Sequence, residues 1–196
     1  MALEITEVFY PKTREEWRSW LVENHVAKTE IWLRRFKKVA QKPSITYDDL
    51  VEECLCFGWI DSIIKKFDEE SNVQRITQRR KKKTFLSELN RQRVWKLQAT
   101  GLMTEAGRIP IADQIGTPDD PYEFPDWAQK SLQEDAEVWE NFTGFPWHYQ
   151  RLKIAWIQEC GPRRREESEK RLNYLLKNTK KGKMYGTVPL LGIKLK

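Results

Sequence analysis

The sequence predicts an α+β fold, in which a small antiparallel β-sheet is packed with helices and is followed by a helical C-terminal unit. Two stretches, residues 29–36 and 59–80, are rich in the β-branched and aromatic residues that favour strands, and helix-like stretches surround them. Residues 116–125 contain three prolines, and the patterns beyond them are helical. With 39% hydrophobic residues and nine tryptophans, the 196-residue chain can bury a sizeable core.

The first helix is predicted to begin at Thr13. Thr13 and Glu16 form a capping box, in which each side chain accepts a hydrogen bond from a free backbone amide. Trp17 and Leu21 then lie four residues apart on one apolar face. The helix is expected to end near His25, and residues 29–36 should form the first strand of the sheet.

A second helix and a β-hairpin are predicted next. Thr46 can cap the helix, and Gly58 is positioned to end it because glycine readily adopts the left-handed conformation found there. Residues 59–67 and 73–80 then alternate as two strands, with a turn at 68–72. The hairpin and the preceding strand together make a three-stranded antiparallel sheet.

The rest of the chain is predicted to be mainly helical. Thr84 or Ser87 can cap a third helix, which Gly101 ends, and residues 104–115 should form only short or broken helices. Later helices are expected at 126–142, from Pro146 onward and at 166–177, before a strand-like end at 187–195. The predicted organisation is an α+β domain at 1–115, a Pro-rich linker at 116–125, a helical unit at 126–178 and a basic tail at 179–196.

Charge is strongly segregated although the net charge is only +6. Residues 75–102 carry nine Lys and Arg against one Glu, whereas residues 103–150 carry two against ten Asp and Glu. Such blocks could form a clasp within the molecule or offer a basic face to a polyanion. A phosphate-bearing partner would relieve the repulsion within the basic run, but a run of lysines is also typical of a solvated loop.

Cysteine usage and apolar patterning predict a cytoplasmic protein without a membrane span, a metal or a cofactor. Three cysteines without framework spacing do not indicate disulfides. Cys54 and Cys56 would point about 200° apart on a helix, and only two histidines exist to complete a metal site. Because a helix C-terminus raises a thiol pKa, both are expected to be buried core residues rather than nucleophiles.

Several motifs resemble the YdeI/OmdA family, also called OmpD-associated or bacteriocin-protection. They are Trp20-Leu21, Asn24-His25, Glu30-Ile31-Trp32-Leu33, Cys56-Phe57-Gly58-Trp59-Ile60-Asp61-Ser62, Arg79-Arg80, Ser87, Asn90, Arg93-Val94 and Gly101. The similarity extends over about residues 8–175. It implies a bacterial-type protein linked to stress or antimicrobial-peptide resistance, and it implies no established activity.

Two uses of the region around the hairpin are predicted. The first is binding of an anionic ligand or nucleic acid by the basic segment 75–96, through the patch Arg75, Arg79, Arg80, Lys81, Lys82 and Lys83. The second is a small-molecule or enzymatic pocket around Trp59, Asp61, Arg80 and Asn90. The full set of candidate ligand-binding residues is His25, Trp32, Trp59, Asp61, Arg79, Arg80 and Asn90.

Each of these residues also has a purely structural interpretation. Asp61 could pair with Arg79 or Arg80 on the returning strand and thereby fix the hairpin. His25 could cap the first helix or act as a general base. The sequence contains no Gly-rich phosphate loop, metal-binding His pair or nucleophile elbow, so it names no reaction and leaves open whether the chain is an enzyme.

Overall fold

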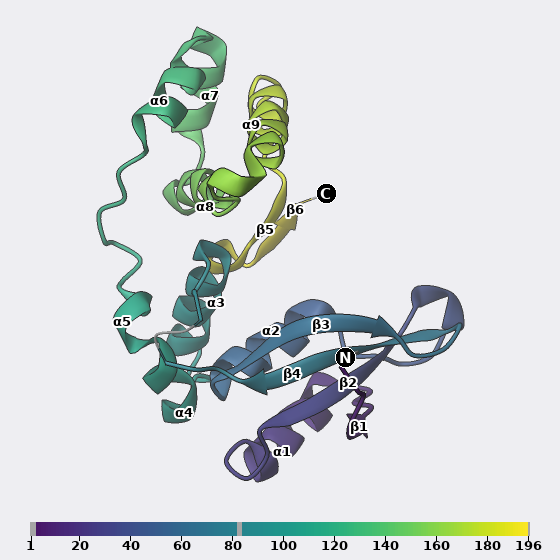
Figure 1. The fold of residues 1–196 in the computed structure, drawn as a ribbon. Coiled ribbons are helices and arrows are strands. Elements are labelled where there is room, and N and C mark those ends of the chain that lie inside the picture. The colour runs from purple at the N-terminus through teal and green to yellow at the C-terminus, as the bar shows by residue number, and fades with distance from the viewer. Residues whose placement is uncertain (1–2, 82–83, 196) are drawn as a thin grey trace. The chain divides into compact units, whose positions relative to one another are not determined.

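A computed structural model describes residues 3–81 and 84–195, and the chain divides into two compact units (Figure 1). Unit 1 comprises Met1–Phe85 and Leu97–Asp113, and unit 2 comprises Leu86–Lys96 and Gln114–Lys196. Helix α3 (Glu88–Ala99) therefore contributes to both units. The domain boundaries that we predict at 115, 125 and 178 stay a prediction.

Unit 1 contains a four-stranded sheet, which confirms the predicted α+β class. Its strands follow the order β1 (Val8–Phe9), β2 (Glu30–Phe36), β4 (Ser71–Gln78) and β3 (Trp59–Lys66). The three predicted strands pair antiparallel, with Trp32 opposite Arg75 and Trp59 opposite Gln78. The sheet is nevertheless mixed, because β1 pairs parallel with β2. A strand of two residues is too short to show alternation, so no pattern in the sequence indicated it.

The helices of unit 1 begin where the sequence predicts. Helix α1 (Arg14–Asn24) starts at Thr13, whose hydroxyl accepts from the Glu16 amide at 3.3 Å, while the Glu16 carboxylate accepts from the Lys12 amide at 2.7 Å. Helix α2 (Tyr47–Cys56) starts at Thr46, which accepts from the Asp49 amide. The remaining elements are η1 (Lys38–Ala40), α4 (Glu105–Arg108), η2 (Ile109–Ile111) and α5 (Ala112–Ile115), which extends into unit 2.

Two glycines allow the end of α2 and the start of α4 to approach within backbone contact. Gly58 has φ of +73°, and a Cβ there would lie 2.4 Å from the carbonyl oxygen of Ala106. A Cβ on Gly107 would lie 2.3 Å from the carbonyl oxygen of Cys56. Thr104 completes the junction, since its amide donates to Cys56 O at 3.3 Å and its hydroxyl caps α4. The Gly58 motif therefore positions the loop from which Trp59 and β3 emerge.

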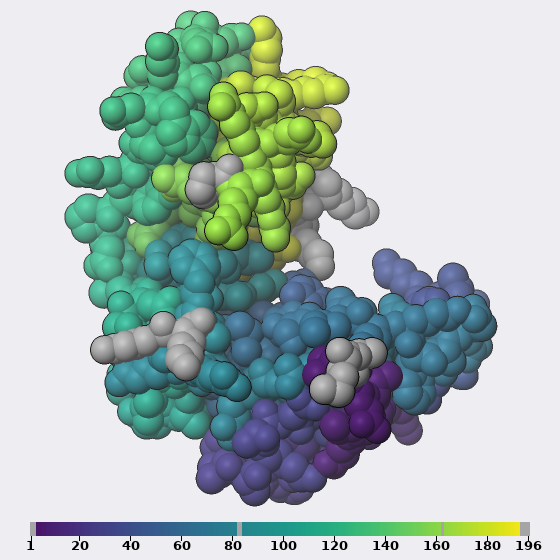
Figure 2. Space-filling model, in the orientation of Figure 1, coloured from purple at the N-terminus to yellow at the C-terminus, as the bar shows by residue number. Residues whose placement is uncertain are grey.

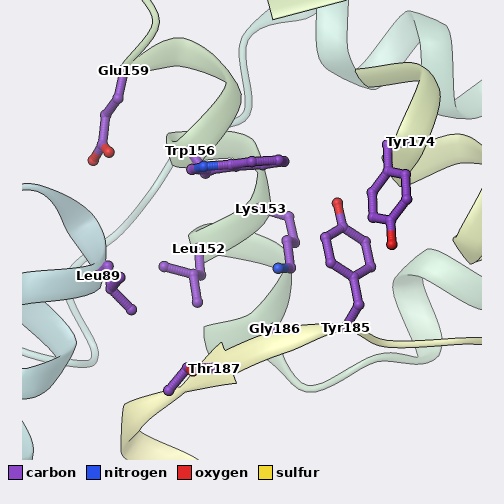
Figure 3. Close-up of a pocket in the computed structure, with 9 residues that line it drawn as sticks. All are labelled: Leu89, Leu152, Lys153, Trp156, Glu159, Tyr174, Tyr185, Gly186 and Thr187. Carbon is purple, nitrogen blue, oxygen red and sulfur yellow. The ribbon is translucent and has the colours of Figure 1, made fainter. Parts of the chain in front are cut away.

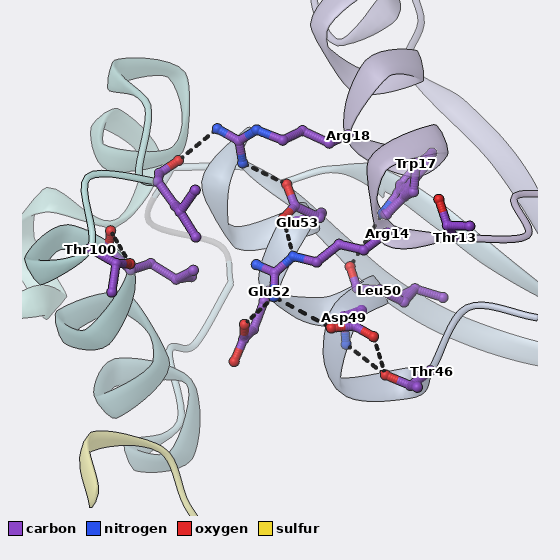
Figure 4. Close-up of polar contacts among 12 residues, drawn as sticks. Thr13, Arg14, Trp17, Arg18, Thr46, Asp49, Leu50, Glu52, Glu53 and Thr100 are labelled. Atoms are coloured by element: carbon purple, nitrogen blue, oxygen red, sulfur yellow. Dashed lines mark hydrogen bonds and ion pairs between the residues drawn. The ribbon is translucent and has the colours of Figure 1, made fainter. Parts of the chain in front are cut away.

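A buried ionic network joins α1 to α2 (Figure 4). Arg14 Nε donates to Glu53 Oε1 at 2.6 Å, and Arg18 Nη1 donates to Glu53 Oε2 at 2.7 Å. The Glu53 side chain is only 1% exposed. Arg18 Nη2 also donates to Leu102 O at 3.0 Å, which ties the segment after α3 to both helices. Both carboxylate oxygens of Glu53 are thus satisfied by arginines, as a buried charge requires.

The β3–β4 hairpin deviates from regular alternation at the edge of the sheet. The register shifts between Asp61 and Ile64, which marks a β-bulge. Ile63 and Ile64 are consequently both about half exposed, whereas regular alternation would bury one of them. In Figure 2 the hairpin contributes part of the blue surface of unit 1.

Unit 2 consists of helices and a short hairpin. These are α6 (Asp126–Gln133), α7 (Ala136–Gly144), α8 (Trp147–Gln158), η3 (Pro162–Arg164), α9 (Arg165–Thr179), β5 (Gly186–Val188), η4 (Pro189–Leu191) and β6 (Ile193–Leu195). Leu132, Phe142, Ile154 and Leu175 form its core. The predicted helical C-terminal unit is confirmed, and the strand-like tail pairs as β5–β6.

One predicted helix of unit 2 is in fact two helices. Residues 126–142 carry a continuous apolar pattern, but α6 ends at Gln133 and α7 begins at Ala136. Asp135 causes the break because its carboxylate accepts from the amides of Glu137 and Val138, which caps a new helix. A single helix over this range was therefore a wrong prediction.

Lys153 on α8 is buried among aromatic rings, and this makes its contribution to stability depend on pH. Its ammonium lies 3.8 Å from the ring centroid of Tyr185 and 5.1 Å from that of Tyr149. Burial lowers the pKa of Lys153 to about 8. Between pH 8 and its ordinary value near 10.5, the unfolded chain binds more protons than the folded one, so this residue's contribution to stability rises with pH.

We expect wild type to gain stability relative to Lys153→Met as the pH rises from about 8 to 10. The gain should reach about 2 kcal/mol, at 1.36 kcal/mol per pKa unit. The difference between the two proteins is the quantity to measure, by urea unfolding, because titrating groups away from Lys153 shift both stability curves alike. A difference that is constant over this range would contradict a lowered pKa for Lys153.

Candidate anion-binding site

Arg79 is the most unusual of the predicted site residues. It directly follows β4, where its amide donates to Gly58 O at 2.7 Å. The residue is only 7% exposed, yet it forms no ion pair in residues 3–81 and 84–195. Its single side-chain hydrogen bond there is a long one, 3.4 Å from Nη1 to Phe85 O, and its buried Nε has no acceptor.

The electrostatic environment of this guanidinium favours an added anion. Burial lowers the pKa of Arg79, and the negative charge of Asp61 only partly opposes that effect. A guanidinium nevertheless keeps its proton, since its ordinary pKa is above 12. A buried cation without a hydrogen-bonded counter-charge is unfavourable, and an anion placed beside it would remove that cost.

Two cavities lie beside Arg79 within unit 1. The first, of about 370 Å³, is lined by residues that include His25, Phe57, Trp59, Gln78 and Arg79. The second, of about 410 Å³, is lined by residues that include Glu30, Arg75, Thr77, Arg79 and Arg80. Arg79 thus lies between an aromatic cavity and a basic one.

Trp59 adds a second unsatisfied donor to the aromatic cavity. It is 1% exposed, and its ring packs edge-on against Trp20 with 5.9 Å between centroids. Its indole Nε1 is buried without a hydrogen-bond partner in the described part of the chain. Buried indole and guanidinium N–H groups normally find acceptors. Both Trp59 and Arg79 line this cavity, and each keeps a buried N–H group without an acceptor in the described residues.

His25 lines the same cavity and also fulfils its predicted structural role. Its amide and its Nδ1 both lie within hydrogen-bonding distance of Leu21 O, at 2.9 and 2.8 Å, so it caps α1. A carbonyl can only accept, which means that Nδ1 carries a hydrogen and donates it. The other ring nitrogen, Nε2, is then the one left for a ligand.

The basic cavity contains part of the predicted patch. Arg75 is neutralised by an ion pair with Glu30, whereas Arg80 and Lys81 are exposed. Lys82 and Lys83 lie outside the described residues. Arg79 and Arg80 are therefore the patch members that bring unneutralised charge to this cavity.

Asp61 does not pair with either arginine, so that interpretation of the hairpin was wrong. Its carboxylate accepts from the Tyr47 hydroxyl at 3.0 Å and from Gln74 Nε2 at 2.6 Å. Asp61 lies opposite Ile76, while Arg79 lies beyond the last pair of the ladder, Trp59 with Gln78. The carboxylate thus has two neutral hydrogen-bond donors instead of an ion pair with Arg79 or Arg80.

Trp32 and Asn90 do not line either cavity. Trp32 is fully buried, and its indole donates to Glu30 at 3.3 Å. Asn90 belongs to unit 2, where its side-chain oxygen accepts from Arg93 at 2.8 Å. One concave surface formed by Trp59, Asp61, Arg80 and Asn90 stays a prediction, because these residues are divided between the units.

The segment that sequence reasoning missed is the end of unit 1. Ala106, Ile109 and Pro110 also line the aromatic cavity. They carry no polar chemistry, and only the close approach permitted by Gly58 and Gly107 brings them there. The sequence identified Gly58 as a helix end, but no local pattern indicated that Gly107 would pack against the same helix end.

The cysteines behave as predicted. Cys54, Cys56 and Cys160 are free and buried. Burial raises the pKa of Cys56 to about 11 and also raises that of Cys54, so neither is a thiolate at neutral pH. In the described residues, no group of three His, Cys, Asp or Glu side chains could hold a metal ion, and no helix is long and apolar enough to cross a membrane.

One family model matches the part of the chain that contains the candidate site. Residues 9–109, which are 101 of the 196 residues, match the model described as "Domain of unknown function (DUF8412)". The chain belongs to this family. Every described residue that lines the two cavities beside Arg79, except Pro110, lies inside that range. This family thus carries the candidate site, and its description assigns no function.

A second family model matches the other part of the chain. Residues 121–182 match the model described as "Bacteriocin-protection, YdeI or OmpD-Associated", which confirms the YdeI/OmdA resemblance. All the motifs that suggested the resemblance nevertheless lie within residues 9–109, outside this match. In comparisons with curated proteins and with solved structures, nothing matched the chain.

Proposed function

We propose that the chain is a binding protein for a small phosphate-bearing ligand, held by Arg79 between the two cavities of unit 1. The observation that carries this proposal is the 7% exposed Arg79 guanidinium, which has no ion pair in the described residues and lines both cavities. Phosphate supplies the charge and the several oxygen acceptors that such a guanidinium binds in a bidentate manner.

The neighbouring groups support a ligand with a phosphate and a flat apolar part. Arg80 offers a second cation on the basic side, and Phe57 and Trp59 offer aromatic walls on the other. The His25 ring, which packs at 5.3 Å from Phe57, provides a further nitrogen. Cavities of about 400 Å³ with a few placed polar groups are typical of small-molecule sites.

Nucleic acid is the second candidate ligand. It is favoured by the exposure of Arg80 and Lys81 next to the basic cavity, and by the nine Lys and Arg residues in 75–102. A nucleic acid would bind mainly through these exposed cations, and its affinity would fall by roughly one log unit per log unit of salt for each phosphate contacted. A buried Arg79 would contribute little to such binding.

The biological role of the chain is proposed separately from its ligand. The description of the family matched at 121–182 supports a role in bacteriocin protection or in the related stress response. A cytoplasmic location would suit binding of a phosphorylated metabolite. The proposal concerns ligand binding and assigns no catalysed reaction to the chain.

We expect Arg79→Gln to abolish binding of nucleotides and pyrophosphate without destabilising the free protein. Truncating one partner of a buried charge pair typically costs 2–5 kcal/mol of binding free energy, which is roughly 30-fold or more in Kd. The free protein should be as stable as wild type or more so, because the substitution removes an uncompensated buried charge. Isothermal titration with AMP, ADP and pyrophosphate measures the first effect, and thermal unfolding the second.

Lys66→Gln is the matched control, since it removes one exposed positive charge from the same unit. It should leave nucleotide affinity unchanged. Two outcomes would replace the small-ligand proposal by the nucleic-acid one. The first is an equal loss of nucleotide affinity in both variants. The second is binding of a mixed-sequence RNA that is unchanged by Arg79→Gln and depends steeply on salt. Absence of binding to all four probes at low salt would refute both.

A further inference from the structure

A separate cavity lies within unit 2, between α8, α9 and the β5 strand (Figure 3). It has a volume of about 340 Å³, and its walls are mainly apolar and aromatic. Leu89, Leu152, Trp156, Tyr174 and Tyr185 supply these walls. All of them belong to unit 2, so the cavity is independent of the Arg79 site.

Lys153 is the one cation among the described residues that line this cavity. It is 6% exposed, and within the described residues its ammonium forms no hydrogen bond and no ion pair. Three rings surround it, with centroids at 3.8 Å for Tyr185, 5.1 Å for Tyr149 and 5.7 Å for Trp156. The rings fix the position of the ammonium and explain how it tolerates burial.

The rings do not satisfy the ammonium completely. An ammonium has three N–H donors, and aromatic faces offer none of the oxygen acceptors that such donors prefer. Gly186 keeps the space beside the ammonium open, because a Cβ there would lie 3.1 Å from Lys153 Nζ. The cavity therefore contains a positioned cation that lacks an oxygen partner.

The nearest acidic lining residue does not supply that partner. Glu159 is engaged elsewhere, since its Oε1 accepts from the amide of Glu88 at 2.7 Å. In Figure 3 its carboxylate points away from Lys153, on the other side of Trp156. One uncompensated positive charge next to apolar walls matches a ligand with one negative charge and an apolar body.

We propose that this cavity binds an amphipathic monocarboxylate, with the carboxylate on Lys153 and an aromatic or aliphatic body against Leu152 and Trp156. A phosphate dianion fits less well, because a single ammonium would leave one charge unneutralised in an apolar cavity. An uncharged ligand of the same shape would leave the ammonium without its acceptor. The site is thus selective for charge at one end and for apolar surface at the other.

Phenylacetate and its neutral amide, phenylacetamide, test the proposal on the whole protein. Phenylacetate should bind with a Kd in the low-millimolar range or tighter, as about 0.3 kcal/mol per heavy atom implies for ten atoms. Phenylacetamide should bind about tenfold more weakly or not at all, because it lacks the charge-assisted bonds to Lys153. Titration followed by NMR measures both, and bound phenylacetate should also raise the pKa of Lys153 above its free value of about 8.

Two variants complete the experiment. Lys153→Met should lose the preference for phenylacetate over phenylacetamide, whereas Lys170→Met, which removes an exposed lysine of the same unit, should keep it. Arg79→Gln should bind phenylacetate normally, so a failure of the Arg79 proposal does not affect this one. Equal binding of the acid and the amide by wild type, or no binding of either, overturns the proposal without any variant.

Discussion

Gly58→Ala is expected to destabilise unit 1 by about 3 kcal/mol. An alanine at φ of +73° adopts the left-handed region at a cost of roughly 1–2 kcal/mol. The new Cβ would also lie 2.4 Å from the carbonyl oxygen of Ala106, so the backbone must move, which adds about 1–3 kcal/mol. Chemical denaturation followed by tryptophan fluorescence measures the loss.

Two other glycines separate these causes. Gly101→Ala has the same left-handed φ of +69° but meets nothing within 4 Å, so it should show the strain alone. Gly107→Ala lies in a helix and should show the clash alone, since its Cβ would be 2.3 Å from Cys56 O. If Gly58→Ala cost no more than Gly101→Ala, the contact between the α2 and α4 ends would be refuted.

Glu53→Gln is expected to lower the free energy of unfolding by about 2–4 kcal/mol. Removing one partner of a buried ion pair costs roughly 3–5 kcal/mol, because the remaining charge is left uncompensated. Arg14 keeps its ion pairs with Glu52 and Asp49. Arg14 and Arg18 are also 25% and 30% exposed, so water can partly solvate them and the loss should lie near or below the lower end of that range. Urea unfolding at constant pH measures the effect.

An exposed pair provides the control. Arg165 and Glu169 form an ion pair on the surface of α9, and their side chains are 87% and 59% exposed. Glu169→Gln removes the same charge and should leave stability almost unchanged, as exposed ion pairs usually contribute little. A similarly small effect of Glu53→Gln would show that the network in Figure 4 does not hold α1 against α2.

Local chemistry made much of unit 1 predictable from the sequence. Thr13 and Thr46 cap their helices because each hydroxyl reaches the free backbone amide three residues later. This contact does not depend on the rest of the chain. The strands at β2, β3 and β4 follow from alternating β-branched and aromatic residues. The same local argument failed at Asp135, where a cap residue inside an apolar pattern started a new helix.

Most of the candidate site was predictable as a set of residues but not as a geometry. The sequence indicated Trp59, Arg79 and Arg80 near the hairpin, and these residues line the cavities. It could not decide the partner of Asp61, because pairing depends on the register between β3 and β4 and a shift of one residue exchanges the faces. Nor could it show that Arg79 would be buried without a counter-charge.

The α+β class, the caps, the hairpin, the charge segregation and the helical C-terminal part follow from the amino-acid sequence alone, because each depends on neighbours within a few residues. Three features became visible only in the folded chain: Gly107 meets Cys56, Glu53 lies between two arginines, and Lys153 is enclosed by rings from α8 and the segment near residue 185. These contacts join residues far apart in the chain. Their energies depend on burial and distance, which no local pattern encodes.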